Sequence, residues 1–275
     1  MIKLLLRNSK ERIIYGLIIL SALITMGILF WIFIFIVKNG MPHLNLKFIL
    51  SNYSGEETGI FPMIINTLMV IGITMIIAVP IGVSTAIYLV EYAEKGRTVN
   101  VIRFSVELLA GIPSIIYGLF GMVFFVTILN FNWSILSGTL TLSIMILPTI
   151  IRTTEESLIS VPKKYREGSL SLGASKIRTI MKVVLPSAKS GILTGIILGM
   201  GRISGETAAI YLTAGMVPRV ARGILESGRT LSVHMYLLAK EGISFEEAYA
   251  TATVLLLLTL VLNIIAKALS RNQEI

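Results

Sequence analysis

The chain has 275 residues, of which 55% are hydrophobic and only 14% charged, and its mean hydropathy is +0.85. Soluble domains carry about 25% charged residues, so an ordinary soluble domain and a disordered chain are both excluded. An outer-membrane β-barrel is excluded too, because its strands alternate and build no long apolar runs. The composition therefore predicts an all-α polytopic membrane helix bundle. In such a protein the net charge of +9 reflects basic cytoplasmic loops, and no nucleic-acid partner is expected.

Stretches without charged residues predict six transmembrane helices within a single domain over residues 1–275. The first stretch, 13–37, is long enough to cross a hydrocarbon core of about 30 Å with some tilt. The charge-free run 108–151 is too long for one span, and Asn130–Trp133 is the expected reversal within it. The predicted spans cover about 13–37, 63–90, 108–129, 134–151, 186–214 and 248–266, with a cytoplasmic loop over 152–185.

Lys and Arg are distributed unequally between the two sides of these spans. Seventeen of the 24 fall on the side that holds both termini, six fall on the other side, and Arg202 lies within a span. The positive-inside rule therefore predicts a multi-pass protein with both termini in the cytoplasm. On the external side, Arg219, Arg222 and Arg229 are expected to form a solvated cationic cluster.

Residues and motifs typical of ATP hydrolysis are missing from the sequence. Cys is absent, and all 15 acidic residues are Glu. There is no G-x-x-x-x-G-K-[ST] loop, and without Asp there is no Walker-B aspartate, so the chain is not expected to hydrolyse ATP. We predict that the chain is not an enzyme and holds no metal or cofactor. Transport would then be driven by another polypeptide or by an ion gradient.

Arg202 and Glu206 are the two charges within a predicted span, in the segment GMGRISGETAAIYLTAG. Each charge costs at least about 2.5 kcal/mol on insertion scales, and ionisable residues inside membranes are usually functional. Four residues apart on one helix, they would share a face, and an intrahelical ion pair is the structural alternative. The functional interpretation is a substrate pathway, since guanidinium binds oxyanions bidentately. Glu206 would hold Arg202 in the empty pathway, or accept a proton from hydrogen phosphate.

Glycines flank these two charges at Gly199, Gly201 and Gly205. They predict either close helix packing or a local break in the helix, and the sequence does not favour one of these.

The predicted cytoplasmic loop contains an amphipathic segment. Leu170, Ala174, Ile177 and Met181 follow one another at steps of four, three and four, which predicts one helix face. The polar remainder consists of Lys163, Lys164, Arg166, Lys176 and Arg178. Such a helix could lie on anionic lipid, pack on its own bundle, or dock into a groove of a soluble partner.

The spacing of this segment resembles the EAA motif of ABC importer permeases, E-A-A-x-x-x-G-x9-I-x-L-P. The matching positions and their neighbours are Glu167, Gly168, Ser169, Gly173, Leu185 and Pro186, with Gly168 and Ser169 in place of the two alanines. The resemblance implies a type I permease fold and a coupling helix that seats in a cleft of an ATP-binding subunit.

Other segments resemble the phosphate-specific ABC importer permeases of the PstA and PstC type. These are R-x-x-G-E-T-A from Arg202, IYLVEYA at Ile87–Ala93 and GIPSIIYGLFG at Gly111–Gly121. The run GETAAIYLTAG and the Leu-rich last helix favour the PstA type, although Ala209 stands where that type commonly has proline. The resemblance implies a phosphate pathway at Arg202 and Glu206 in a bacterial or archaeal cell membrane.

The implied partners are a homologous permease of the PstC type, two ATP-binding subunits that would bind the ATP, and an extracellular or periplasmic phosphate-binding protein. Two alternatives remain open at this stage. One is an ABC permease for molybdate, sulfate or phosphonate. The other, from a different class, is an ion-gradient-driven anion transporter or channel whose basic loop binds lipid.

Overall fold

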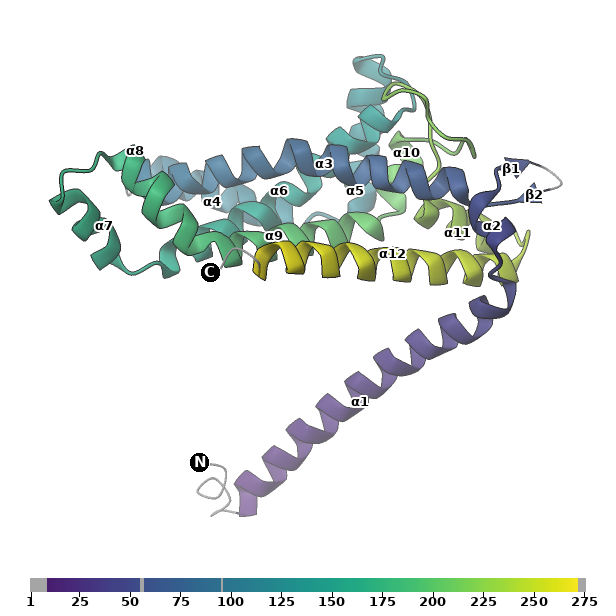
Figure 1. Cartoon of the computed structure of the whole chain (residues 1–275), viewed down its shortest axis with the longest axis horizontal. Coiled ribbons are helices and arrows are strands. Elements are labelled where there is room, and N and C mark those ends of the chain that lie inside the picture. The colour runs from purple at the N-terminus through teal and green to yellow at the C-terminus, as the bar shows by residue number, and fades with distance from the viewer. Residues whose placement is uncertain (1–8, 55–56, 95, 272–275) are drawn as a thin grey trace.

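The computed structural model describes residues 9–54, 57–94 and 96–271, and its elements are almost all helices (Figure 1). Lys3 and Arg7, which were counted in the charge bias, lie outside the described residues. The N-terminal part contains α1 (Ser9–Gly40), the short 3-10 helix η2 (Met41–His43) and α2 (Leu46–Leu50). A two-residue antiparallel pair follows, β1 (Tyr53–Ser54) and β2 (Glu57–Thr58), with Tyr53 opposite Thr58.

Most of the remaining chain forms long helices that run along one axis. The middle elements are α3 (Phe61–Ile87) with its π-helical end η3 (Tyr88–Tyr92), α4 (Arg97–Ala110), α5 (Ser114–Gly121) with η4 (Met122–Ile128), and α6 (Ile135–Ser160). The later elements are α7 (Lys163–Ser171), α8 (Lys176–Thr179), the π-helical η5 (Ile180–Val184), α9 (Leu185–Ser204), α10 (Ala208–Thr213), α11 (Leu231–Lys240) and α12 (Phe245–Arg271).

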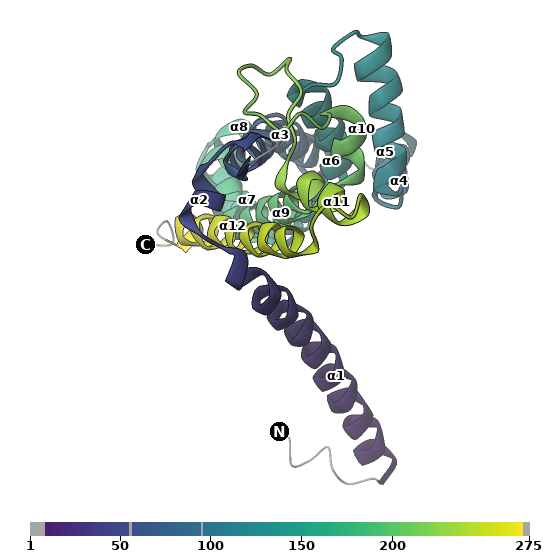
Figure 2. The ribbon, with the colours of Figure 1, turned by 90° about the vertical axis from the view of Figure 1, so that its right-hand side faces the viewer.

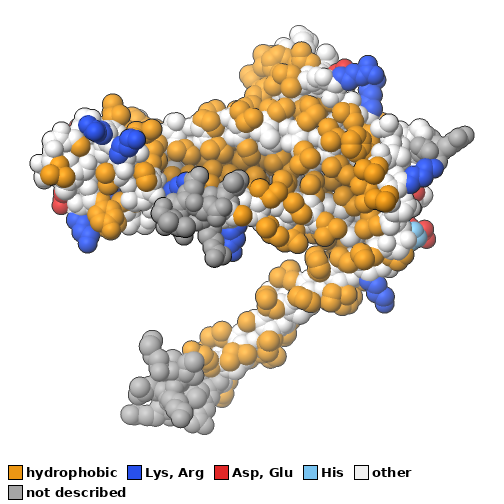
Figure 3. Space-filling model, viewed as in Figure 1, with side chains coloured by type: hydrophobic (Ala, Val, Ile, Leu, Met, Phe, Trp, Pro, Cys, Tyr) orange, Lys and Arg blue, Asp and Glu red, His pale blue; other side chains and the backbone are white. Residues whose placement is uncertain are grey.

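Five helical stretches of the described chain are long and apolar enough to cross a membrane, and a bent pair makes a sixth if it is counted as one span. The five are Ile13–His43, Phe61–Tyr92, Ile135–Ser160, Lys176–Ser204 and Phe245–Ala268. Apolar side chains cover the middle of the molecule in Figure 3, and Lys and Arg gather mostly toward its two ends. The prediction of an all-α polytopic membrane bundle is therefore confirmed.

The core forms where α3 and α6 cross close together, with α9 packed on both. Its buried residues include Val70 and Ala78 of α3 and Leu142 and Ile146 of α6. At Gly82 the helices approach so closely that a Cβ would lie 2.6 Å from Cγ2 of Ile150. A larger residue there would separate α3 from α6.

By contrast, α1 extends away from this bundle in both views (Figures 1 and 2). It contacts α12 near its own C-terminal end, where the Phe35 ring meets Tyr249 at 5.7 Å and Thr253 Oγ1 donates to the Ile36 carbonyl at 3.4 Å. The apolar residues of the rest of α1 are exposed, as expected of a helix surrounded by lipid.

The third predicted span, 108–129, differs from the structure. The chain bends by 101° between α4 and α5. Pro113 lies at this bend and has no N–H to continue the helical hydrogen bonds, so α4 ends at Ala110. The Tyr117 hydroxyl donates to the Leu109 carbonyl at 2.8 Å and joins the two arms of the bend. A run of residues without charge does not indicate where a helix bends.

The predicted cytoplasmic loop over 152–185 is too long. Helix α6 continues to Ser160, and the next long helical stretch begins at Lys176. The charges that suggested a loop are partly paired with α4, because Arg152 contacts Glu107 at 2.7 Å and Arg103 contacts Glu155. Ion pairing thus allows α6 to extend past its apolar part.

The segment between α10 and α11 is fastened to α3 by one buried side chain, Asn66. Its Nδ2 donates to the carbonyls of Arg219 at 2.9 Å and Arg229 at 3.1 Å, and its Oδ1 accepts from the Ala221 N–H at 3.0 Å. Gly228 packs directly on this amide. Asn66 therefore satisfies three backbone groups of a segment that has no regular structure.

We predict that Asn66→Ala loosens this segment, because it leaves three backbone groups without partners. Each buried unsatisfied group costs about 1–3 kcal/mol, and water entry limits the total. Hydrogen exchange of residues 216–229 should become faster, and the thermal unfolding midpoint of the purified protein should fall. Asn39→Ala, which removes one exposed hydrogen bond to Phe35, is the control. Unchanged exchange in Asn66→Ala would contradict this role.

Candidate functional site

The first candidate site is the exposed helix α7, which contains Glu167, Gly168 and Ser169 of the predicted coupling motif. No residue of α7 is buried. Helix α7 ends shortly before Gly173, whose φ of +83° belongs to the left-handed region that favours glycine. The predicted single helix face from Leu170 to Met181 is therefore wrong, since this turn separates α7 from α8. Helix α7 and the turn that follows it form a projection at one end of the molecule (Figure 1), and most of their side chains are exposed.

A partly buried ion pair holds α7 in place. Arg166 donates from Nε to Glu91 Oε1 at 2.9 Å, and its Nη2 lies 2.7 Å from the same oxygen. Its two terminal nitrogens also donate to the carbonyls of Val161 and Leu158, both at 2.8 Å. The side chains are only 19% and 9% exposed. One guanidinium thus joins α7 to the end of α3 and to the last turn of α6.

A second contact links α7 to the helix that follows it. Ser169 Oγ and Thr179 Oγ1 lie 2.9 Å apart, and Lys176 Nζ sits 4.7 Å above the Tyr92 ring. Leu185 lies further along, packed against a core cluster, and Pro186 is exposed on the same helix. The structure therefore brings Glu167–Gly173 together at the projection, while Leu185 and Pro186 belong to the helix behind it.

Pro186 also does not begin the fifth span, as its position had suggested. The helical stretch starts ten residues earlier at Lys176 and passes through the π-helical η5. There the Leu185 N–H donates to the Ile180 carbonyl, five residues back instead of four. The hydrogen-bond pattern of the helix is therefore already altered just before Pro186, which has no N–H to donate. One helical stretch consequently runs from the projection to Ser204.

The second candidate site is the break between α9 and α10, which lies around Arg202 and Glu206. Helix α9 ends at Ser204, and α10 begins at Ala208. The expected uninterrupted span over 186–214, with both charges on one helix face, is therefore wrong. Arg202 is exposed in the last turn of α9, where a cation is favourable to the helix dipole. Thirteen residues, or about 20 Å of helix, separate it from Lys189.

Glu206 lies within the break and is partly buried. Its carboxylate Oε1 accepts from the Ala209 N–H at 3.4 Å, and its carbonyl accepts from Ser232 Oγ of α11 at 2.7 Å. No ion pair within 4 Å joins Glu206 to Arg202, both of which are described. The intrahelical ion pair that was the structural alternative is thus not formed, and the guanidinium is left accessible.

The three glycines around this break have different surroundings. A Cβ at Gly199 would meet Met75 at 3.2 Å, so this residue serves helix packing. Gly201 and Gly205 face open space, and Gly205 is the residue at which α9 ends. Packing on the other side of the break is close, since a Cβ at Gly118 of α5 would lie 2.9 Å from the Ala209 Cα.

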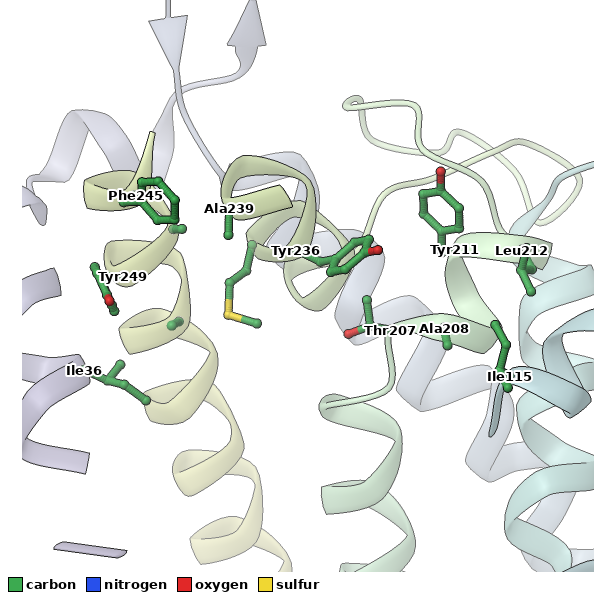
Figure 4. Close-up of a pocket in the computed structure, with 13 residues that line it drawn as sticks. Ile36, Ile115, Thr207, Ala208, Tyr211, Leu212, Tyr236, Ala239, Phe245 and Tyr249 are labelled. Carbon is green, nitrogen blue, oxygen red and sulfur yellow. The ribbon is translucent and has the colours of Figure 1, made fainter. Parts of the chain in front are cut away.

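A cavity of about 660 Å³ adjoins the break but includes neither charge (Figure 4). Its walls are largely apolar, and Thr207, Tyr211, Tyr236 and Tyr249 are the residues with hydroxyl groups among those that line it. Lys240 lies over the rings of Tyr211 and Tyr236, at 5.7 and 5.4 Å. These lining residues offer an oxyanion no direct ion pair.

The external arginines do not form the predicted cluster. Arg219 and Arg222 are exposed, but Arg229 turns inward, donates to the Met216 carbonyl at 2.8 Å and contacts His234 Nδ1 at 3.2 Å. The Tyr53 ring packs against both side chains. Burial lowers the pKa of Arg229, and burial together with the Arg229 charge lowers the pKa of His234 to about 3.

The matches to known proteins agree with this geometry. A family model described as the inner membrane component of binding-protein-dependent transport systems matches residues 78–274. The chain belongs to this permease family. It is 34% identical to the probable ABC transporter permease protein YqgI of Bacillus subtilis, over 95% of each chain. It is 31% identical to the phosphate transport system permease protein PstA of Haemophilus influenzae, over 98% of this chain and 96% of the relative.

Solved structures support the same fold. This permease matches a chain of a bacterial alginate ABC transporter in complex with its pentasaccharide-bound periplasmic protein, with a TM-score of 0.72 and 16% identity over 96% and 95% of the two chains. It also matches a chain of the MetNI methionine ABC transporter, with a TM-score of 0.59 and 20% identity over 79% and 95%. The type I importer permease fold implied by the EAA resemblance is confirmed.

Sequence reasoning missed three residues of these sites. Arg166 was only one of five basic residues, and its partner Glu91 is 75 positions away. Asn66 carried no charge or motif that pointed to it. Ser232 lies 26 residues from the carbonyl that it satisfies. A single sequence does not show which of its distant residues are in contact. The carbonyls in the last turn of α6 need hydrogen-bond donors, however, and this is a general reason to look for a nearby Arg.

Removal of the Arg166 side chain should free α7 from the bundle. Breaking a buried pair from one side costs about 3–5 kcal/mol, because Glu91 loses its partner. We expect Arg166→Ala to speed hydrogen exchange of residues 163–171 and to lower substrate import per ATP hydrolysed in the assembled transporter. Lys164→Ala is the matched control, since Lys164 is exposed and contacts its neighbour Tyr165. Equal exchange in the two variants would contradict the clamp.

Acid should destabilise the permease through His234. Its folded pKa of about 3 lies below the ordinary histidine pKa of 6.5, so between these values the unfolded chain binds a proton that the folded chain does not. The contribution of neutral His234 to the free energy of unfolding is present above pH 6.5 and is lost as the pH falls toward 3. Between pH 7 and pH 5 the free energy of unfolding should fall by about 2 kcal/mol.

Thermal unfolding of the purified protein against pH measures this effect. His234→Gln should flatten the dependence in that range. His43→Gln, which changes the exposed second histidine, should leave it as in the wild type. Identical profiles for His234→Gln and the wild type would show that His234 is not held neutral.

Proposed function

We propose that this permease forms the translocation pathway for inorganic phosphate in an ATP-driven importer. The observation that carries the proposal is Arg202, an exposed guanidinium at the end of α9 with no acidic side chain within 4 Å among the described residues. Placed about 20 Å beyond Lys189, it would lie past the middle of the bilayer, where an unpaired cation is costly unless it has a function. The phosphate-transport names of several relatives support this substrate.

In this proposal Arg202 binds the phosphate oxyanion, and Glu206 selects for it. The guanidinium offers a planar pair of donors that match two phosphate oxygens. Glu206 lies just beyond Arg202, and its carboxylate can accept a hydrogen bond from the hydroxyl group that hydrogen phosphate carries and sulfate lacks. The open space at Gly201 and Gly205 supports access of an anion to the break.

The same proposal assigns the partners. A homologous permease of the PstC type completes the pathway, two cytoplasmic ATP-binding subunits bind the ATP and receive α7, and a phosphate-binding protein delivers substrate to the opposite side. Both termini then lie in the cytoplasm. The exposed projection Glu167–Gly173, fixed to α3 and α6 by Arg166, supports the contact with an ATP-binding subunit.

The test is uptake of labelled phosphate by vesicles that contain the complete transporter, binding protein and ATP. We expect Arg202→Gln to lower uptake about 100-fold while the complex still assembles, because a desolvated charge pair is worth about 2–5 kcal/mol. Glu206→Gln should reduce the preference for phosphate over sulfate. Arg222→Gln, an exposed arginine outside the bundle, is the control. Normal phosphate uptake by Arg202→Gln would refute the pathway, and faster molybdate or sulfate uptake by the wild type would refute the substrate.

A further inference from the structure

A large cavity lies between α4 and α7, at the level where the helices α3 with η3 and α6 end. Its volume is about 1290 Å³, and α3, α4, α6 and α7 or the turns at their ends all contribute to its walls. Neither the pathway at Arg202 nor the fold requires an open cavity here.

One face of α4 changes from cationic to apolar along this cavity. Arg97, Val101, Phe104 and Leu108 follow at steps of four, three and four, so they share a face of the helix. All four are exposed, the three apolar ones by 55–59%. From α6, Ile159 adds another apolar side chain to the cavity, and it is 61% exposed. A charge at the end of a span followed by exposed apolar residues is the pattern of a lipid-facing helix.

The cations that line the cavity fall into two groups. Arg103 and Arg166 are paired with Glu155 and Glu91. Arg97 at the start of α4 and Lys163 at the start of α7 have no carboxylate within 4 Å among the described residues, although Glu167 also lines the cavity. Two unpaired cations from different helices therefore border a cavity that also has exposed apolar side chains on its walls.

We propose that this cavity binds an anionic phospholipid, with the headgroup phosphate between Arg97 and Lys163 and an acyl chain along Val101, Phe104 and Ile159. Basic pockets between membrane helices are suited to such headgroups. A soluble partner would match the cations but not the apolar stripe, which continues along α4 to Leu108 beside the bundle. The assignment of this site to the lipid leaflet that faces the ATP-binding subunits rests on the proposed function. The site itself does not depend on that function.

The first test is lipid retention by the assembled transporter in native mass spectrometry, with equal amounts of phosphatidylglycerol and phosphatidylcholine. The wild type should retain phosphatidylglycerol preferentially, and Arg97→Gln with Lys163→Gln should lower this preference about fivefold for each charge removed. Arg178→Gln with Lys182→Gln removes two exposed cations outside the cavity and should leave the preference intact. Equal losses in both double variants, or no preference in the wild type, would overturn the proposal.

The second test places a fluorescent probe in the cavity. Phe104→Trp is made in a background in which both natural tryptophans, Trp31 and Trp133, are changed to Phe. Brominated phosphatidylglycerol should quench this probe more than brominated phosphatidylcholine, and the difference should disappear with Arg97→Gln and Lys163→Gln. Quenching in the isolated chain but not in the assembled transporter would show that an ATP-binding subunit fills the cavity, and the lipid proposal would fail.

These outcomes are independent of the substrate. A transporter that retains phosphatidylglycerol at this cavity but does not import phosphate would refute the proposed function and leave the lipid site standing. Phosphate import without selective lipid retention would refute the lipid site alone.

Discussion

A helix that ends inside a membrane bundle exposes backbone groups that lipid cannot satisfy, and the break between α9 and α10 is built around this constraint. The Glu206 carbonyl is satisfied by Ser232 of α11, the Glu206 N–H by the Ile203 carbonyl, and the Ala209 N–H by the Glu206 carboxylate. The close approach of α5 at Gly118 shields the start of α10. Because the protein supplies these partners, the break can persist, and Arg202 is presented at a helix end and not paired along a helix face.

The break and the projection at α7 are the two ends of one helical stretch. It runs from Lys176, beside the Ser169–Thr179 contact, to Ser204, two residues after Arg202. At the α7 end, Arg166 ties the projection to α3 and α6 through Glu91 and two carbonyls. A displacement of α7 would therefore be transmitted to the three helices that form the core. In the proposed importer, this connection couples ATP hydrolysis to the position of Arg202.

Charge-free runs were enough to predict the class of fold, because a membrane helix must exclude charges over a known length. The EAA spacing and the segment around Arg202 were likewise enough to predict the family. The break after Ser204 was not predicted, since Gly205 and the four-residue spacing of Arg202 and Glu206 are compatible with an unbroken helix. The Arg166–Glu91 pair and the inward turn of Arg229 depend on contacts between distant segments, which one sequence does not reveal.

The pathway at Arg202 is tested most directly by a structure of the complete transporter, with both permeases, ATP-binding subunits and binding protein, captured during phosphate transport. The proposed pathway predicts anion density within hydrogen-bonding distance of the Arg202 guanidinium, inside a continuous path that passes the Gly205–Thr207 break. Density for phosphate along a path that avoids Arg202, with Arg202 paired to Glu206 in every state, would contradict it.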